Sequence, residues 1–254
     1  MNPEVQPSLL VMTATINPQP GAVGLDRTDP ALRMKDYCEA LDFYLSKKSR
    51  LIDRIVFVEN SHSDLSPLQR LAENNRGSKQ VEFVSFYGLD YPPEYIRGYG
   101  EFKLLDYAFH NSRLLTQLKS DDKWWKVTGR YRAVNIDSLV RTAPRHYDMY
   151  ADFRFGKHWV DVRLLSFSRS GYERLILGRY HEMAGLLLEK YFYDRFGPLF
   201  EGKRGSVDGI DPEFRVVPRI EGIGGWREIK YMSGTLRMRH YVRSTLKFLR
   251  NLAT

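Results

Sequence analysis

Two hydrophobic periods alternate along the first half of the chain. Apolar runs of strand length occupy residues 8–15, 52–60, 81–86 and 124–135. Between them, apolar residues recur every three or four positions, over residues 30–46, after Ser66-Pro67 and over 101–118. Strands that alternate with helices in this way are typical of a parallel sheet whose faces are covered by helices.

The pattern changes after residue 145. Residues 147–156 and 159–168 read as two strands joined by a Gly-Lys-His turn, which predicts an antiparallel addition to the sheet. Helical spacing returns over residues 179–196. Further on we expect a loop rich in Gly and charge with a short strand at 214–218, and then a C-terminal helix at 235–254.

Composition agrees with a folded α/β chain. The 254 residues are 43% hydrophobic, and they contain no internal repeat and no low-complexity linker. We therefore predict one domain over residues 1–254, divided into parts at 1–144, 145–234 and 235–254. A single cysteine excludes a disulfide within the chain and a multi-cysteine metal site. With no apolar run of roughly 18–20 residues and no signal peptide at the start, we expect a cytoplasmic protein.

The chain carries 39 Lys and Arg against 31 Asp and Glu, a formal net charge of +8. This excess predicts an anionic partner, which could be a nucleic acid, a phosphorylated small molecule or an acidic membrane face. The basic residues are dispersed, however, and no nucleic-acid recognition motif is present. We therefore rank a nucleic-acid-binding protein as the alternative and expect no nucleic-acid partner.

Polar residues gather where the predicted parallel strands end. Ligands of open parallel sheets bind outside the carboxyl ends of the strands. The residues at these ends are Thr13, Thr15, Glu59, Asn60, Lys126, Thr128, Gly129 and Arg130. A carboxylate can accept from a nucleobase, Lys and Arg can neutralise a diphosphate, and glycine lets the backbone approach a phosphate. The alternative is ordinary turn chemistry, with Asn60 and Ser61 starting a turn and Gly129 marking a bulge.

Four segments carry a family resemblance: "VFVENSHSDLSPL" (56–68), "YIRGYGEFKLLDYAF" (95–109), "WWKVTGRYRAVN" (124–135) and "RIEGIGG" (219–225). Together they resemble nucleotide-sugar glycosyltransferases with the GT-A fold, of the bacterial surface-polysaccharide (capsule or O-antigen) type. The resemblance implies a GT-A-like, Rossmann-type mixed sheet flanked by helices. It also implies sugar transfer from a nucleotide-sugar donor to a saccharide or lipid-linked saccharide acceptor, with the donor bound by residues 1–144 and the acceptor by 145–234.

One departure from this family concerns the metal. GT-A enzymes usually hold a divalent ion with an Asp-x-Asp motif after the fourth strand, where this chain has Lys-Val-Thr-Gly-Arg. We therefore expect no metal cofactor, and we expect Lys126 and Arg130 to neutralise the donor diphosphate. Asp152 and Asp161, on strand-like segments, are the remaining candidates for metal ligands.

Two further segments supply candidate site residues. Arg97, Gly98, Gly100 and Lys103 flank a loop that we expect to close on the donor, although this spacing is typical of any mobile loop. Inverting transfer also needs a base for the acceptor hydroxyl. In "GRYHEMAGLLLEKY" (178–191), Glu182 is the first candidate because it falls at an expected helix start, where acids are also common for other reasons. His181 is the second candidate and Asp152 the third.

The C-terminal segment, residues 235–254, has the pattern of a basic amphipathic helix. Such a helix suits an anionic lipid surface, which predicts a peripheral location on the inner face of the membrane; the alternative is a docked helix with a solvated basic side. A second alternative function is a sugar nucleotidyltransferase. That class needs a Gly-rich, Lys-containing loop after the first strand, which "NPQPGAVGLDR" does not match.

Overall fold

The computed structural model describes residues 7–225 and 230–231. Its central feature is a seven-stranded mixed sheet with the strand order β3-β2-β1-β4-β7-β6-β8. The strands are β1 (Ser8–Ala14), β2 (Ile52–Glu59), β3 (Gln80–Ser85), β4 (Lys123–Thr128), β6 (Met149–Arg154), β7 (Trp159–Ser168) and β8 (Ile210–Asp211). Strands β1 to β4 are parallel, whereas β7 runs antiparallel to both β4 and β6. The predicted Rossmann-type mixed sheet with an antiparallel addition is therefore confirmed.

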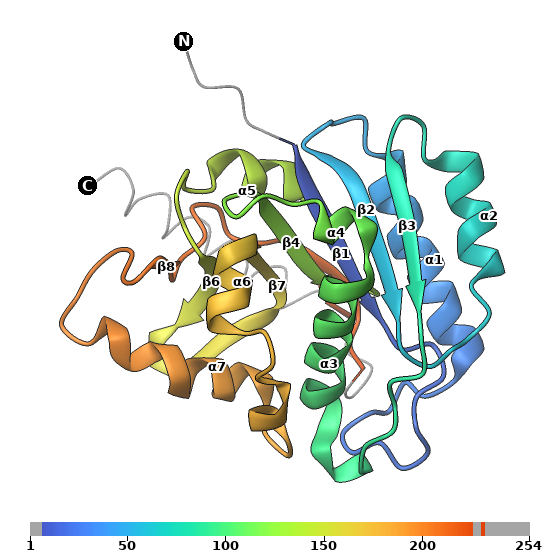
Figure 1. Cartoon of the computed structure of the whole chain (residues 1–254). Helices are drawn as coiled ribbons and strands as arrows, with labels where there is room; N and C mark the ends of the chain where they lie inside the picture. Colours follow the sequence, from blue (N-terminus) through green and yellow to red (C-terminus); the bar gives the residue numbers. More distant parts are fainter. Residues whose placement is uncertain (1–6, 226–229, 232–254) are drawn as a thin grey trace.

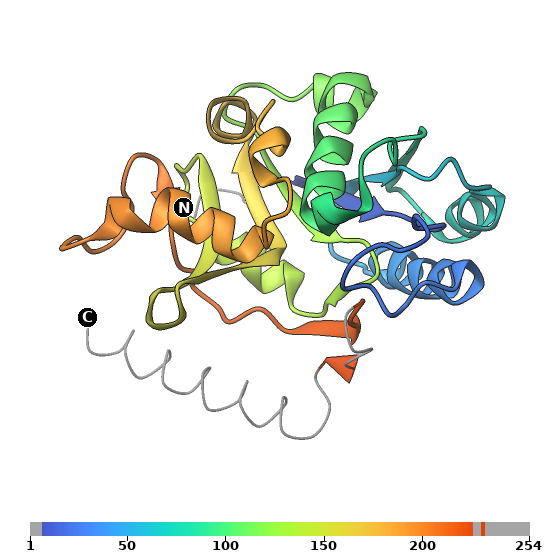
Figure 2. The same ribbon diagram turned by 90° about the horizontal axis from the view of Figure 1, so that it is seen from below.

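Helices cover both faces of this sheet (Figures 1 and 2). Side chains of α1 (Pro30–Ser46), α2 (Ser66–Asn75) and α5 (Ile136–Thr142) share one core with the sheet. Those of α3 (Ile96–Asn111), α4 (Arg113–Thr116), α6 (Arg169–Leu175) and α7 (Leu188–Phe196) share the other. A small second sheet joins β5 (Arg132–Ala133), β9 (Ile220–Ile223) and β10 (Lys230–Tyr231). Short 3₁₀ turns are η1 (Pro93–Tyr95), η2 (Phe155–Lys157), η3 (Tyr180–Met183) and η4 (Gly197–Phe200).

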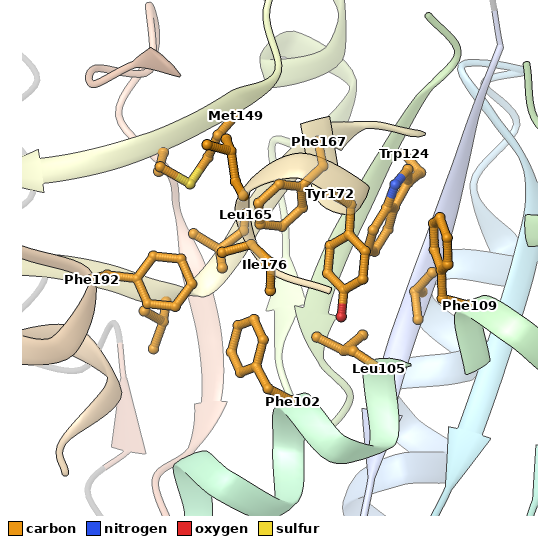
Figure 3. Close-up of a cluster of buried hydrophobic side chains, with 14 of the residues drawn as sticks. Phe102, Leu105, Phe109, Trp124, Met149, Leu165, Phe167, Tyr172, Ile176 and Phe192 are labelled. Carbon is orange, nitrogen blue, oxygen red and sulfur yellow. The ribbon is translucent and has the colours of Figure 1, made fainter. Parts of the chain in front are cut away.

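Strand β4 contributes one tryptophan to each core, because successive side chains of a strand point to opposite faces. Trp124 lies among aromatic side chains under α3 and α6, with its ring centroid 5.2 Å from that of Tyr172 (Figure 3). Trp125 packs on the opposite face, 5.8 Å from the ring of Phe214. Burial on both faces fixes the register of β4, and so fixes which polar residues emerge at its carboxyl end.

Several predicted boundaries are wrong. The helix expected over 179–196 is divided into η3 and α7, because Gly185 adopts a positive φ of 71° between them. The helix expected over 101–118 ends at Asn111, and Ser112, with extended backbone, caps the next short helix. Residues 214–218 form no strand, and the next strand is β9 (Ile220–Ile223). The expected helix at 235–254 lies outside the described residues.

The loop expected around Gly98 and Gly100 is also wrong, since both glycines lie inside α3. Their role is close packing. A Cβ on Gly98 would lie 2.6 Å from Leu188 Cγ, and a Cβ on Gly100 would lie 1.9 Å from the Tyr91 hydroxyl. In the part of the chain that the structure describes, the helices are too short or too polar to cross a lipid bilayer.

Candidate functional site

The carboxyl ends of the three central parallel strands bring distant polar residues together. In the strand register, Thr13 of β1 lies opposite Val58 of β2 and Thr128 of β4. Glu59 pairs with Ala14, one position further along. Residues that are up to 115 positions apart in sequence therefore share one edge of the sheet, which is where an open α/β sheet binds its ligands.

A buried cluster centred on Glu101 occupies this edge. The Lys126 ammonium lies 2.7 Å from Glu101 Oε1, and it also donates to Thr128 Oγ1 at 3.1 Å and to the Val162 carbonyl at 2.8 Å. The hydroxyls of Thr13 and Thr128 donate to the same Glu101 oxygen at 2.7 and 3.0 Å. A lysine has three donors, and here all three are used.

This cluster contradicts the expectation that Lys126 binds a diphosphate directly. The Lys126 side chain is fully buried, and its ammonium faces the Glu101 carboxylate. The cause is a tertiary contact, because α3 brings Glu101 over the ends of β1 and β4. Lys126 and Thr128 thus hold Glu101 in position.

Glu101 is a candidate site residue that the sequence analysis missed. Burial by itself raises the pKa of its carboxyl group, but the Lys126 charge and the hydrogen bonds from Lys126, Thr13 and Thr128 outweigh burial and lower this pKa below its ordinary value. Its side chain is 17% exposed, and among the described residues no hydrogen bond reaches Oε2. An ionised carboxylate with one open oxygen therefore remains at the edge. Its signal in the sequence was the glutamate of "GYGE" (98–101), within the segment 95–109 that carries the family resemblance.

Glu59 has a different environment. It is fully buried, and it accepts hydrogen bonds from the backbone N–H groups of Ile16, Ser61 and Ser63 at 3.0, 2.8 and 3.2 Å, and from the Ser61 hydroxyl. These bonds tie the loop after β1 to the loop after β2. The carboxylate has no open side, which contradicts the expectation that Glu59 receives a nucleobase directly.

Three other predicted donor-binding residues make contacts inside the protein: Thr15, Asn60 and Gly129. The Thr15 hydroxyl donates to Asn60 Oδ1 at 2.7 Å, and Asn60 is itself buried. Gly129 is needed for packing, because a Cβ there would lie 2.7 Å from the Thr13 carbonyl oxygen. This close approach is to strand β1, whereas the sequence analysis attributed it to a phosphate. Lys103 forms an ion pair with Asp90 and lies over the Tyr91 ring.

Arg130, two residues after the end of β4, is buried and forms no ion pair with a carboxylate of residues 7–225 or 230–231. It is 6% exposed, its Nη1 donates to the Ile223 carbonyl at 3.1 Å, and its buried Nε has no hydrogen-bond partner. A Cβ on Gly225 would lie 2.8 Å from Arg130 Nη2 and 3.3 Å from Arg97 Nη1. The guanidinium groups of Arg130 and Arg97 therefore converge on the backbone of Gly225, and Arg97 itself is exposed.

A third arginine adds to this positive charge. Arg33 of α1 is buried and donates to the carbonyls of Thr15 and Arg27 at 2.7 and 2.9 Å. Burial lowers the pKa of its guanidinium and the positive charge of Arg130 lowers it further, although Tyr37 opposes both. Among the described residues, Arg33, Arg97 and Arg130 form no ion pair, and we call them the arginine cluster. Unpaired buried cations are costly, so this arrangement favours an anionic ligand.

The first candidate for the acceptor base, Glu182, has its negative charge balanced by neighbouring groups. Glu182 lies in η3 and not in a helical first turn; it is 42% exposed and accepts from Tyr191, Arg179 and Arg195 at 2.7, 2.9 and 2.9 Å. The Tyr191 hydrogen bond, more than the arginines, lowers the pKa of its carboxyl group. His181 is exposed, and its ring is tilted against that of Tyr180, with ring centroids 3.9 Å apart.

Asp152 and Asp161 face each other across β6 and β7. Asp152 is buried beside Arg154, and Asp161 pairs with Arg154 and Arg163 at 2.6 and 2.5 Å, which holds the pKa of Asp161 well below its usual range despite burial. Within residues 7–225 and 230–231, no group of three or more His, Cys, Asp or Glu could hold a metal ion.

No protein-family model and no curated protein sequence matches the chain. Among solved structures, it is similar to a cytidylyltransferase from Leptospira borgpetersenii serovar Hardjo-bovis (strain JB197), at 12% identity and a TM-score of 0.42, covering 75% of this chain and 72% of that one. It is also similar to HddC from Yersinia pseudotuberculosis, at 11% identity and a TM-score of 0.39, over 95% and 99% of the two chains.

A further similar structure is a protein from Desulfovibrio desulfuricans G20 that is thought to be a nucleotide-diphospho-sugar transferase. It is 16% identical with a TM-score of 0.34, over 65% of this chain and 64% of that one. Similarities this low describe a loose likeness of fold. They assign no activity to this chain, and they do not support the narrower resemblance to the surface-polysaccharide type.

Proposed function

We propose that this chain is a glycosyltransferase that uses a nucleotide-sugar donor and binds the donor diphosphate with Arg97 and Arg130. The observation that carries the proposal is the arginine cluster at the carboxyl edge of β1 and β4. A buried guanidinium whose Nε has no hydrogen-bond partner, and which forms no ion pair among the described residues, is stabilised by an anion that accepts its hydrogen bonds. As in the sequence analysis, Arg130 and Arg97 are assigned to the donor diphosphate. The positive charge that was expected from Lys126 is supplied instead by Arg33.

The chemistry follows from where negative charge develops. When a glycosidic transfer begins, the bond between the anomeric carbon and the diphosphate lengthens, and its electron pair remains on the departing nucleoside diphosphate. Fixed cations stabilise that charge without reorganising during the reaction. Glu101, ionised and held by Lys126, would accept a hydrogen bond from a donor-sugar hydroxyl through its open oxygen. The segment from Thr13 to Thr15 would line the nucleoside.

The acceptor side of the proposal is a saccharide or a lipid-linked saccharide at the inner face of the membrane. It is supported by two adjacent exposed leucines, Leu186 and Leu187, immediately before α7. They could contact an apolar part of such an acceptor. The basic segment 235–254 would add attraction to anionic lipid.

The same arginine cluster could hold a nucleoside triphosphate, so a sugar nucleotidyltransferase is the second candidate. Product analysis separates the two. The chain is incubated with UDP-, GDP-, dTDP- and CMP-sugars, and separately with nucleoside triphosphates plus sugar 1-phosphates, each with EDTA or manganese. Release of a nucleoside diphosphate from a UDP-, GDP- or dTDP-sugar, or of CMP from a CMP-sugar, supports glycosyl transfer. Release of pyrophosphate from a triphosphate would support the second candidate, and absence of both reactions would contradict the proposal.

A further inference from the structure

Four tyrosines from separate elements meet beside the first turn of α3. Tyr99 of α3 lies at the centre. Its ring centroid is 4.8 Å from that of Tyr91, 5.1 Å from that of Tyr95 and 5.1 Å from that of Tyr180. We call these four residues the tyrosine cluster. They come from the loop after β3, from η1, from α3 and from η3, so the tertiary fold assembles this surface.

The backbone around the tyrosine cluster is fixed by contacts between these elements. The Gly185 N–H donates to the Tyr95 carbonyl at 3.2 Å, which ties the turn after η3 to η1. The Gln19 side-chain amide donates to the Tyr91 carbonyl at 2.9 Å. Tyr91 also packs on α3, since a Cβ on Gly100 would lie 1.9 Å from its hydroxyl oxygen. Rings that are held in this way lose little freedom when a ligand binds.

The Tyr99 hydroxyl is unusual for a buried tyrosine. Tyr99 and Tyr191 are both 8% exposed, and the Tyr191 hydroxyl donates to Glu182 Oε2 at 2.7 Å. The Tyr99 hydroxyl forms no hydrogen bond with any described residue, although a buried tyrosine hydroxyl usually finds a partner. The hydroxyls of the other three members, which are half-buried, form none in this part of the chain either. The surface therefore combines ring faces with hydroxyls that the protein leaves for a ligand.

The tyrosine cluster adjoins the proposed diphosphate site. Arg97 lies between Tyr95 and Tyr99 in the chain, and one turn of an α-helix rises only about 5.4 Å. In glycosyl transfer, the acceptor hydroxyl must reach the anomeric carbon, which is bonded to the diphosphate. The acceptor therefore has to lie beside the residues that hold the diphosphate, and the tyrosine cluster meets this requirement.

We infer that the tyrosine cluster is the acceptor subsite and that it binds a pyranose ring. Its role as the acceptor subsite rests on the proposed function. The apolar C–H face of the sugar packs on the rings of Tyr95 and Tyr180, and the sugar hydroxyls form hydrogen bonds with Tyr99. A saccharide fits this surface because it has both an apolar face and many hydroxyls.

Leu186 and Leu187 extend this surface with apolar side chains. They follow Gly185, which is bonded to Tyr95, and they are 47% and 50% exposed. A sugar that carries an alkyl chain therefore gains additional apolar contact. A comparison of methyl glycosides with octyl glycosides separates a free saccharide from a lipid-linked one.

The first test is saturation-transfer difference NMR of the full chain with the methyl glycosides of glucose, galactose, mannose and N-acetylglucosamine. At least one should receive saturation on its ring C–H protons. Tyr180→Ala should raise its Kd by about tenfold or more, as expected for loss of a packed aromatic ring. Tyr99→Phe should raise the Kd by about two- to tenfold, the range for one hydrogen bond. Thermal unfolding of Tyr99→Phe should be unchanged, because the lost hydroxyl has no partner among the described residues.

Tyr193→Ala is the matched control. Tyr193 is half-buried and its ring stacks on that of His158 with centroids 4.9 Å apart, so it forms a tyrosine–histidine pair outside the cluster. It should bind the glycoside as the original protein does. Absence of saturation transfer to all four glycosides would overturn the inference. Unchanged affinity in both Tyr99→Phe and Tyr180→Ala would overturn it as well.

The octyl glycosides identify the source of the sugar. Tighter binding of the octyl form that is lost in Leu186→Ser supports a lipid-linked acceptor, and equal binding of both forms supports a free saccharide. Octyl binding that survives Tyr180→Ala, with no binding of the methyl form, would show contact with the alkyl chain alone and would overturn the inference.

Isothermal titration calorimetry with UDP and GDP separates this inference from the proposed function. Tyr180→Ala and Tyr99→Phe should keep the Kd of the nucleotide within about twofold, which is well under 1 kcal/mol. If they lose nucleotide affinity and keep glycoside affinity, the cluster holds the nucleobase and the inference is wrong. If neither nucleotide binds the original protein, the proposed function fails, while binding of the glycosides to the tyrosine cluster is still measured.

Discussion

Lys126 and the arginine cluster lie at the same edge of the sheet, and they differ in how their positive charge is balanced. Lys126 is fully buried, yet its ammonium meets a carboxylate, a hydroxyl and a carbonyl. Arg130, only four residues later, is almost as buried and meets a carbonyl and another arginine. The charge of Lys126 is balanced within the protein, without a ligand. We propose that an anionic ligand balances the charge of the arginine cluster, so the difference in internal pairing, rather than the sign of the residues, points to the binding site.

The largest effect expected from this difference is on folding. Lys126→Ala leaves the Glu101 carboxylate in a largely buried site without its cation, so the free energy of unfolding should fall by about 3–5 kcal/mol. Urea denaturation measures this change. Lys190→Ala is the control, because its ion pair with Asp194 is exposed and should contribute no more than about 1 kcal/mol. If Lys126→Ala lowers the free energy of unfolding by less than about 1 kcal/mol, then Lys126 does not balance the charge of Glu101.

Arg130→Met, in contrast, should leave the free energy of unfolding almost unchanged. The substitution removes one hydrogen bond to the Ile223 carbonyl, but it also removes a buried cation that has no ion pair within the described residues. We expect the free energy of unfolding to stay within about 1 kcal/mol of the original protein. Urea denaturation without ligand checks this. A loss comparable to that of Lys126→Ala would show that Arg130 is structural, and the contrast between the two groups would fail.

The smallest effects are in the pH dependence of stability. The pKa of Glu101 is lowered on folding, so its contribution is present above the unfolded pKa and is lost as pH falls through the folded value. The raised pKa of Glu189 has the reverse sign: its ionised form costs stability above the folded value. At about pH 7, Glu189→Gln should therefore gain stability and Glu101→Gln should lose it. Each tenfold difference in proton affinity between the folded and unfolded chains corresponds to about 1.4 kcal/mol.

Thermal or urea unfolding across the acidic range tests both signs. The Glu101 difference should shrink as pH falls from the ordinary glutamate pKa to the lowered folded pKa, below which this carboxyl group is protonated in both states. The Glu189 difference should shrink earlier, as pH falls from its raised folded pKa to the ordinary value. Equal behaviour of the two variants would contradict the opposite pKa shifts of Glu101 and Glu189.

The strand ends were predictable from the sequence because they depend on local patterns. The apolar runs of β1, β2 and β4 are buried on both faces along most of their length, and their parallel pairing places Thr13, Glu59 and Thr128 at one edge, as expected. What could not be predicted is which of these side chains are internally paired. The bond between Lys126 and Glu101 depends on how α3 docks over two strands, and that docking depends on close contacts at Gly98 and Gly100.

The predicted helix start was wrong for a related reason. A continuous helix over 179–196 would have put Glu182 in its first turn, but Gly185 with positive φ interrupts it and moves the helix start to Leu188. Glu189 then takes the first-turn position that the sequence analysis gave to Glu182. The helical spacing of apolar residues continues through the break, so the pattern itself contains no sign of it.

The central claim is that the arginine cluster binds a diphosphate, and isothermal titration calorimetry with nucleoside diphosphates tests it most directly. Arg130→Met should weaken binding by about 1.5–3 kcal/mol, the range for hydrogen bonds to a charged group, and Arg130→Lys should recover only part because lysine lacks the planar fork. Arg76→Ala, an exposed arginine at the end of α2, is the control and should bind as the original protein does. Equal affinity in Arg130→Met and Arg76→Ala would contradict the account.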